Sequence, residues 1–213
     1  MGIKTKISIV ILSLLFFSNI TAAQVKIGFL GGVNHSIFNS TNAHMGTRSY
    51  VTGFIIGGVI NFQLNQLFSL QAEPRYTQMG FNVNITEASL EASAEVHSEF
   101  IELPLLVVIN FTESSLKPLV SAGINIGYLQ SIEQDSKING EKTKIDVIRD
   151  YNRVNVSLDL GIGLQYHLTP ASNIIFNTRY SHGLSNINKL LNGSSEGTYT
   201  RGIQVLLGAM FKI

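Results

Sequence analysis

The sequence predicts an all-β protein, an eight-stranded antiparallel up-and-down β-barrel that spans a membrane. Three observations predict this fold. Apolar residues alternate with small or polar residues in eight separate stretches, and short and long connections alternate between those stretches. Charged residues make up only 14% of the 213 residues, whereas soluble domains carry about 25%.

Composition excludes several other classes of protein. Hydrophobic residues make up 45% of the chain, which is incompatible with intrinsic disorder. The absence of cysteine excludes a disulfide scaffold and a thiolate metal site. The net charge of +1 includes Lys4 and Lys6, so the rest is close to neutral and gives no reason to expect nucleic acid as a partner. The glycine pairs Gly31-Gly32 and Gly57-Gly58 open no predicted helix, so we expect no phosphate-binding loop and no cofactor.

Residues 1–23 are predicted to be a cleaved signal peptide, and residues 24–213 a single barrel domain. Lys4 and Lys6 form a positive amino-terminal region, and an apolar segment follows from Ile7 to Phe17. Small residues then lead to a cleavage site after Ala23. The alternative is a membrane anchor, but a spanning helix needs about 20 apolar residues, and this segment is too short.

The eight stretches are predicted to be strands because each has one continuous apolar face at a period of two. The sixth stretch is the most regular, with an apolar residue at every even position from Val154 to Leu168. In chain order, the predicted strands are Val25–Ile37, Phe54–Leu64, Phe68–Tyr76, Leu103–Phe111, Val120–Tyr128, Val154–Leu168, Ile174–Tyr180 and Ile203–Ile213.

The connections distinguish a barrel from a sandwich. Three are short: Asn65–Gln66, Thr112–Ser115 and Thr169–Ser172. Four are long: Asn39–Ser49, Asn82–Val96, Ser131–Asn152 and Ser185–Thr198. Outer-membrane barrels have short periplasmic turns and long outer loops, whereas a Greek-key sandwich does not require this alternation. Both termini are therefore expected in the periplasm.

The second row of each strand indicates what lies inside the barrel. A soluble barrel of the lipocalin type would expose this row to water and would be rich in Lys and Glu. Here the row holds glycines and a few isolated charges, which favours a narrow, filled lumen and an apolar row that faces lipid. The charged residues are Glu73, Arg75, Glu102, Asp159 and Arg179. We expect them to form a buried network of ion pairs; the alternatives are an ion pathway or catalytic carboxylates.

Aromatic residues on the apolar row gather at the strand ends, as expected of two interfacial girdles. Those near the short turns are Phe62, Phe68, Phe111, Tyr166 and Phe211, and those near the long loops are Tyr76, Tyr128 and Tyr180. The alternative is that they are ordinary core aromatics, which does not explain their position at strand ends.

Several motifs resemble a known family. Leu70-Gln71-Ala72-Glu73-Pro74-Arg75-Tyr76 and Phe100-Ile101-Glu102-Leu103-Pro104 are similar to strands three and four of the PorT-like outer-membrane β-barrel family of Bacteroidetes. Lys117-Pro118, Leu160-Gly161-Ile162-Gly163 and the segment from Arg179 to Ile187 resemble later strands of that family. The resemblance implies an eight-stranded barrel in a bacterial outer membrane, in a family whose founding members are associated with protein secretion.

Two further groups of residues were candidates for chemistry. A hydrolase or acyltransferase at the outer rim would need a serine, a histidine and an acid, and the residues there are His35, Ser36, His97, Glu99, Ser181 and His182. Ser181 and His182 are adjacent on one strand, so they point to opposite faces.

The second long connection carries a glutamate at every fourth residue: Glu87, Glu91, Glu95 and Glu99. This spacing is typical of a solvated acidic loop, or of a site for divalent cations or a basic partner.

We therefore predict a non-enzymatic outer-membrane barrel that acts through its outer loops or as an accessory of protein secretion or envelope assembly. Its expected partners are outer-membrane lipid and secretion or envelope proteins. The alternatives are a lipid-modifying enzyme at the rim, a small-solute channel, and a soluble ligand-binding barrel. No metal or catalytic residue is assigned.

Overall fold

A computed structural model describes residues 24–40, 47–87, 90–111, 114–138, 141–189 and 197–213. The strands are β1 Gln24–Ser40, β2 Thr47–Gln63, β3 Phe68–Ala72, β4 Arg75–Glu87, β5 Leu90–Asn110, β6 Leu116–Ile138, β7 Glu141–Asp146, β8 Val154–Thr169, β9 Ser172–Gly183 and β10 Thr198–Lys212. A short 3-10 helix, η1, spans Ile148–Asp150. No helix among these residues is long and apolar enough to cross a membrane.

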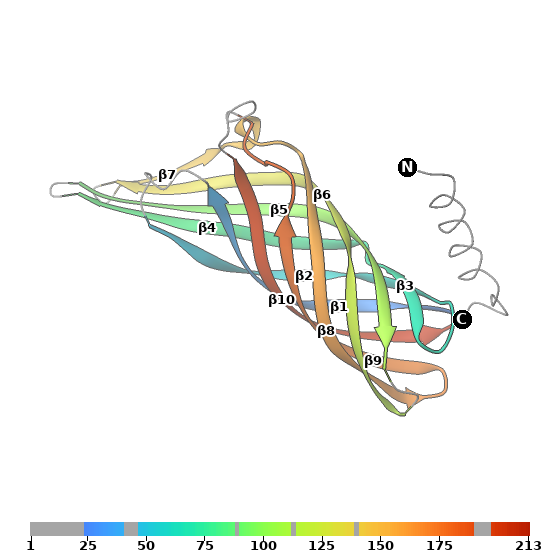
Figure 1. Ribbon diagram of the computed structural model, residues 1–213. Coiled ribbons are helices and arrows are strands. Elements are labelled where there is room, and N and C mark those ends of the chain that lie inside the picture. Colours follow the sequence, from blue (N-terminus) through green and yellow to red (C-terminus); the bar gives the residue numbers. More distant parts are fainter. Residues whose placement is uncertain (1–23, 41–46, 88–89, 112–113, 139–140, 190–196) are drawn as a thin grey trace, which may run out of the picture.

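The strands close into an antiparallel ring of eight, as the sequence predicts (Figure 1). β1 pairs with both β2 and β10, and this pairing closes the ring. β3 and β4 occupy one position in the wall, because both pair with β2 on one side and with β5 on the other. β7 pairs with β6 and adds a strand beside the ring at one end.

The wall strand that contains β3 and β4 is interrupted at Glu73 and Pro74. Proline has no N–H to contribute to a ladder, so regular pairing stops there. The Pro74 carbonyl accepts a hydrogen bond from Gly58 N at 2.9 Å, and Glu73 N donates to the Pro104 carbonyl at 3.0 Å. These bonds hold the interruption in place, and they fix Glu73 and Arg75 on either side of it.

Two of the predicted long loops are largely strands, so those predictions were wrong in detail. In place of a loop over 82–96, β4 and β5 continue as a hairpin in register from Arg75 opposite Glu102 to Glu87 opposite Leu90. In place of a loop over 131–152, β6 continues to Ile138 and turns into β7. Backbone pairing continues through these ends although their sequence lacks a continuous apolar alternation. We call residues 81–87, 90–99, 131–138 and 141–146 the projection; it extends from one end of the barrel in Figure 1.

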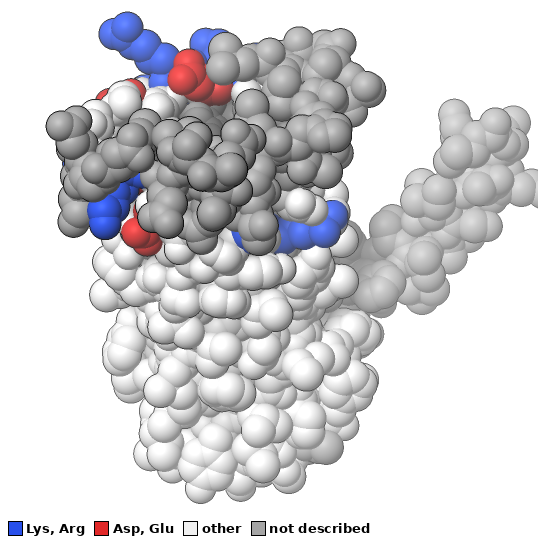
Figure 2. Space-filling model, turned by 90° about the vertical axis from the view of Figure 1, so that its left-hand side faces the viewer, with Lys and Arg blue, Asp and Glu red and all other residues white. Residues whose placement is uncertain are grey.

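Side chains of the barrel wall point alternately out and in. On β8, Leu160 and Ile162 are 49% and 67% exposed, whereas Asp159 is fully buried. On the face shown in Figure 2, the lower part of the wall carries no charged residue, and the visible Lys, Arg, Asp and Glu residues lie in the upper part, toward the projection. The molecule therefore has an apolar outer wall and a buried polar interior.

Candidate functional site

The predicted interior charges meet in one layer inside the barrel, contributed by four positions of the wall. Arg179 on β9 forms a two-pronged ion pair with Glu73: Nη1 donates to Oε2 at 2.8 Å and Nη2 donates to Oε1 at 2.9 Å. Arg75 on β4 donates from Nε to Glu102 Oε2 on β5 at 2.9 Å. All four side chains are at most 1% exposed. Such bidentate and charge-assisted contacts are the strong class of hydrogen bond.

Asp159 joins the two arginines into one network, which we call the charged layer. Its Oδ2 lies 3.8 Å from both Arg75 Nη2 and Arg179 Nη1. Its Oδ1 accepts a hydrogen bond from Ser181 Oγ at 2.6 Å. The layer thus contains three carboxylates and two guanidinium groups, and the sequence-predicted residues of the interior all belong to it.

Neutral polar side chains also donate hydrogen bonds to Glu73 and Glu102. Glu102 accepts hydrogen bonds from Thr77 Oγ1 at 2.8 Å and from Asn125 Nδ2 at 2.9 Å. Glu73 accepts one from Gln71 Nε2 at 2.7 Å, and Gln71 in turn accepts one from Asn61. A cavity beside Glu73, Gln71 and Arg179 has a volume of about 20 Å³, enough for roughly one water molecule. The side chains of the layer therefore pack closely around this small cavity.

An apolar cluster inside the barrel separates the charged layer from the end that carries the projection. Its members come from five different segments and are at most 5% exposed: Phe38, Met79, Phe81, Val96, Phe100, Leu129, Ile132 and Ile187. The Phe38 and Phe81 rings pack with centroids 5.3 Å apart. Val147, Ile148 and Tyr151 pack against it from the connection between β7 and β8, and burial raises the pKa of the Tyr151 hydroxyl. We call this group the outer apolar cluster.

Two smaller buried clusters lie beside the charged layer and extend toward the short turns. Their members are Leu30, Ile55, Val59, Leu206 and Met210 in one and Leu106, Val108 and Leu119 in the other. Ile175 contacts both. Sequence reasoning expected a polar inward row and missed these residues. The signal was present, because Ile55, Val59, Leu106 and Val108 are apolar at positions that alternate with the lipid-facing row.

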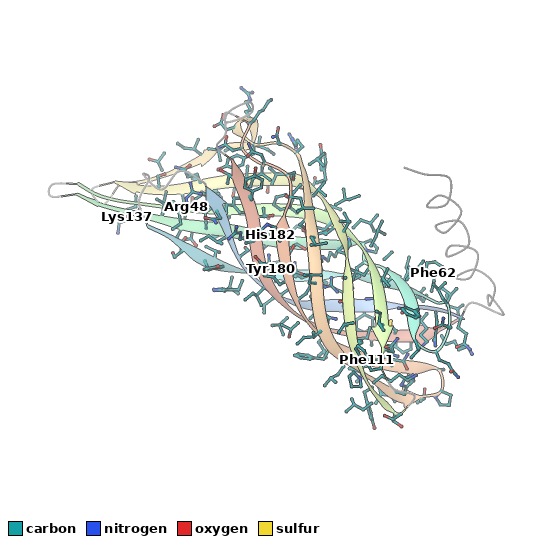
Figure 3. The ribbon with its side chains drawn as sticks, viewed as in Figure 1. Arg48, Phe62, Phe111, Lys137, Tyr180 and His182 are labelled. Atoms are coloured by element: carbon teal, nitrogen blue, oxygen red, sulfur yellow. The ribbon has the colours of Figure 1, made fainter. Side chains whose placement is uncertain are left out.

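The predicted girdle aromatics lie on the outer wall. Phe62, Phe111, Tyr166 and Phe211 are 42–59% exposed near the short turns, and Tyr128 and Tyr180 are 47% and 43% exposed nearer the other end. Phe68 and Tyr76 are half-buried. Figure 3 shows Phe62 and Phe111 near the turn end, with Tyr180 and His182 farther along the barrel. Two aromatic contacts were not expected: Phe54 packs on Tyr76, and the Tyr50 ring stacks on the His35 ring with centroids 4.8 Å apart.

The rim serines and histidines do not assemble into a triad among the described residues. Ser181 points inward to Asp159, whereas His182 points outward, where its Nδ1 lies 3.3 Å from the Tyr180 hydroxyl. His35 Nδ1 contacts Thr52 Oγ1 at 2.9 Å. His97 Nε2 contacts Glu95 Oε1 at 3.2 Å on the exposed face of β5, and Ser36 Oγ accepts a bond from Gly80 N inside the barrel. No serine hydroxyl contacts a histidine ring in the described part of the chain; His167 Nδ1 approaches only the backbone carbonyl of Ser115, at 3.4 Å.

The projection presents a polar surface with both signs of charge. Glu95, Asp135 and Lys144 lie in one row across β5, β6 and β7, and they line a groove of about 620 Å³. Lys144 Nζ lies 2.7 Å from Glu133 Oε2, and this hydrogen bond and charge raise the pKa of Lys144. Glu99 accepts a bond from Ser131, and the side chains of Glu87 and Glu91 lie outside the described residues. Within the described ranges, no cluster of three His, Asp or Glu residues is arranged to hold a metal ion.

A family model described as "Outer membrane protein beta-barrel domain" matches residues 17–189. The chain belongs to this family. The resemblance found in the strand motifs is thereby confirmed at the level of the outer-membrane β-barrel domain. No curated protein matches the chain.

Solved structures of bacterial outer-membrane barrels are similar to this one. OprG from Pseudomonas aeruginosa has a TM-score of 0.53 at 11% identity, with 90% of this chain and 96% of that chain covered. Outer Membrane Protein W from E. coli gives 0.49 at 14% identity, covering 90% and 98%. Neisserial surface protein A gives 0.46 at 15% identity, covering 88% and 97%. At 11% identity, the similarity to OprG shows a shared fold and nothing about function.

Membership in this family places the barrel in the bacterial outer membrane. The exposed apolar side chains of the wall, such as Leu160 and Ile162, therefore contact lipid. The predicted signal peptide and its cleavage site at Ala23 lie outside the described residues and stay predictions.

Proposed function

We propose that this outer-membrane barrel is non-enzymatic and acts through its projection, as a docking surface for a protein of the secretion or envelope-assembly machinery. On this proposal the chain is a member of the PorT-like branch of outer-membrane barrels, which its strand motifs resemble. The aromatic residues of the outer wall would form the two interfacial girdles that hold the barrel at a fixed depth.

One observation carries the proposal: the barrel interior is filled, whereas the outer part of the projection, beyond Phe81, Val96 and Ile132, carries exposed polar side chains. The lumen contains the charged layer, two buried apolar clusters beside it and the outer apolar cluster on the side of the projection. By contrast, Glu95, Asp135, Lys137 and Lys144 are exposed on the projection beside a 620 Å³ groove. Strands that extend beyond the wall add nothing to the barrel's closure, and this favours a role in contact with another molecule.

The orientation of the rim residues supports the non-enzymatic part of the proposal. A serine nucleophile needs a base within hydrogen-bond reach. The Ser181 hydroxyl is bonded to Asp159 and Ser157 inside the barrel, and the neighbouring His182 is on the opposite side of the wall. A lipid substrate outside the barrel could therefore contact His182 but could not reach the Ser181 hydroxyl, which points into the lumen.

Site-specific crosslinking in intact cells tests the proposal. A photoreactive residue at Lys137 or Lys144, both exposed on the projection, is expected to capture the same envelope protein. The matched control is Ala171, exposed in the short turn between β8 and β9, which is expected to capture a different set of proteins or none. Capture from Ala171 alone, or no capture from either projection position in cells grown under secreting conditions, would overturn the proposal.

A further inference from the structure

A groove crosses the lipid-facing wall and is distinct from the projection. It has a volume of about 540 Å³ and spans β5, β6, β8, β9 and β10. This volume lies within the roughly 300–1,000 Å³ of ordinary small-molecule sites. Its lining includes the small side chains Ala122 and Thr178 and the larger side chains Leu160, Ile162 and Tyr180. A nearly wholly apolar groove in this place fits the acyl chain of a membrane lipid.

Two basic side chains lie immediately beyond the outer end of this groove. His182 is two residues after Tyr180 on β9, and Arg201 is two residues before Ile203 on β10; Tyr180 and Ile203 both line the groove. His182 and Arg201 are directly opposite each other in the strand register. Figure 3 shows Tyr180 and His182 on the same part of the barrel. The groove and the basic pair thus form one continuous surface.

The basic pair has no acidic partner among the described residues. Arg201 takes part in no ion pair there, and its Nε has no hydrogen-bond partner. His182 uses one ring nitrogen toward the Tyr180 hydroxyl at 3.3 Å, which leaves the other to contact a ligand. A guanidinium at the edge of the lipid-facing wall is costly without an anion beside it. A phosphate between them would satisfy both side chains.

We propose that the protein binds one phosphate-bearing lipid of the outer leaflet, with an acyl chain in this groove and a phosphate on Arg201 and His182. The position of the basic pair toward the projection end selects the outer leaflet. The apolar groove selects a lipid over a free anion, because inorganic phosphate would contact the basic pair alone. The proposal does not depend on a role for the projection.

Native mass spectrometry of the detergent-purified barrel tests the two halves of the site separately. The probes are bisphosphorylated lipid A and the same lipid with both phosphates removed. The unaltered protein is expected to retain one bisphosphorylated lipid A and at least about 10-fold less of the dephosphorylated lipid. Inorganic phosphate at the same concentration is expected not to compete.

Variants separate the headgroup contact from the groove. Arg201→Gln with His182→Gln is expected to remove the preference for the phosphorylated lipid, and Arg201→Lys to retain part of it. Ala122→Leu with Thr178→Leu fills the groove and is expected to reduce binding of both lipids. The matched control is Arg153→Gln, which removes an outer arginine whose guanidinium lies over the Tyr128 ring at 5.9 Å and is expected to leave binding unchanged. The heat-dependent gel shift of folded barrels checks that each variant is folded.

Three outcomes would overturn the proposal. The first is equal retention of bisphosphorylated lipid A by the unaltered protein and the Arg201/His182 variant. The second is an equal loss in the Arg153→Gln control, which would indicate a general charge effect. The third is a dimer that the groove-filling variant abolishes while lipid binding persists, which would make this face an interface between copies of the chain.

Discussion

Arg179 connects side chains from distant parts of the sequence inside the barrel. It comes from β9, and its guanidinium contacts Glu73, which is 106 positions earlier in the sequence, and lies 3.8 Å from Asp159. A charge in this layer cannot reach water by changing its rotamer, because the surrounding side chains are fully buried. Removal of one partner would leave the others as uncompensated buried charges.

We therefore expect Arg179→Ala to lower the free energy of unfolding by about 3–5 kcal/mol, the range for breaking a buried ion pair. Urea unfolding of the barrel refolded in detergent micelles would measure it. The double variant Arg179→Met with Glu73→Gln should lose less stability than the sum of the losses in the single variants Arg179→Met and Glu73→Gln, because it removes both charges of the pair. Arg201→Ala, outside the layer, is the control and should change the midpoint little. Additive losses in the double variant would contradict a coupled pair.

Gly57 and Gly58 are adjacent, but only Gly57 lacks room for a β-carbon. A β-carbon on Gly57 would lie 2.4 Å from Arg75 Cβ and 2.5 Å from the Pro74 carbonyl oxygen, whereas one on Gly58 would meet nothing closer than 3.7 Å. Gly57→Ala is therefore expected to destabilise the barrel by about 1–3 kcal/mol through overpacking. Gly58→Ala should be neutral or slightly stabilising, since glycine weakens a strand. Equal midpoints for the two variants in the same urea titration would contradict the close approach at Gly57.

At this scale the sequence predicted which residues are charged and inward, but not which residues they contact. Alternation assigns a side chain to a face, so Glu73, Arg75, Glu102, Asp159 and Arg179 could be placed inside together. The pairing of Arg179 with Glu73 across the lumen depends on barrel tilt and strand stagger, which no local pattern encodes. The outer apolar cluster was missed for a related reason: Val96, Ile132 and Ile187 lie in segments that were interpreted as loops.

Among the elements, the hairpins of the projection differ most from expectation. Strand prediction relied on apolar alternation, which fails for residues 87–95 because their sequence is rich in Glu, Ala and Ser. The ladder between β4 and β5 nevertheless continues to Glu87 opposite Leu90. The break at Pro74 was also missed, because the apolar row runs through it from Phe68 to Tyr76.

The outer part of the β4–β5 hairpin is expected to be dispensable for folding. Replacing residues 84–93 by a two-residue Asn-Gly turn removes strand ends beyond Phe81 and Val96, the last residues on these strands that belong to the outer apolar cluster. The unfolding midpoint of the shortened barrel should stay within about 1 kcal/mol of the original, the range typical of surface changes. A control that also removes Phe81 and Val96 should lose several kcal/mol. A large loss from the shorter deletion would show that the projection supports the barrel.

For the molecule as a whole, the order of layers along the barrel axis decides what can cross it. Eight strands enclose only enough space for their own side chains, and here that space contains the charged layer and three buried apolar clusters. An ion would have to cross the outer apolar cluster unsolvated and then separate Arg75 from Glu102.

We expect no stepwise conductance from the purified barrel in planar bilayers at moderate voltage. Opening a path should need changes in two layers together, such as Phe38→Ser and Phe100→Ser in the apolar cluster combined with Arg75→Ala. Either set of substitutions alone is expected to give no conductance, since the other layer still blocks the lumen. Regular single-channel steps from the unaltered protein would show that the interior opens, and would favour the small-solute channel among the alternatives.

The long sequence separation between Glu73 and Arg179 also limits how the chain can assemble. Their ion pair joins β9 to the β3/β4 position across the lumen, so it forms only after the ring has nearly closed. Until then, a partly inserted sheet would expose these charges and an unpaired strand edge to hydrocarbon, and both are strongly unfavourable there. Entry into the bilayer and closure of the ring must accordingly occur as one concerted step, or with a catalyst that shields the open edge until β1 meets β10.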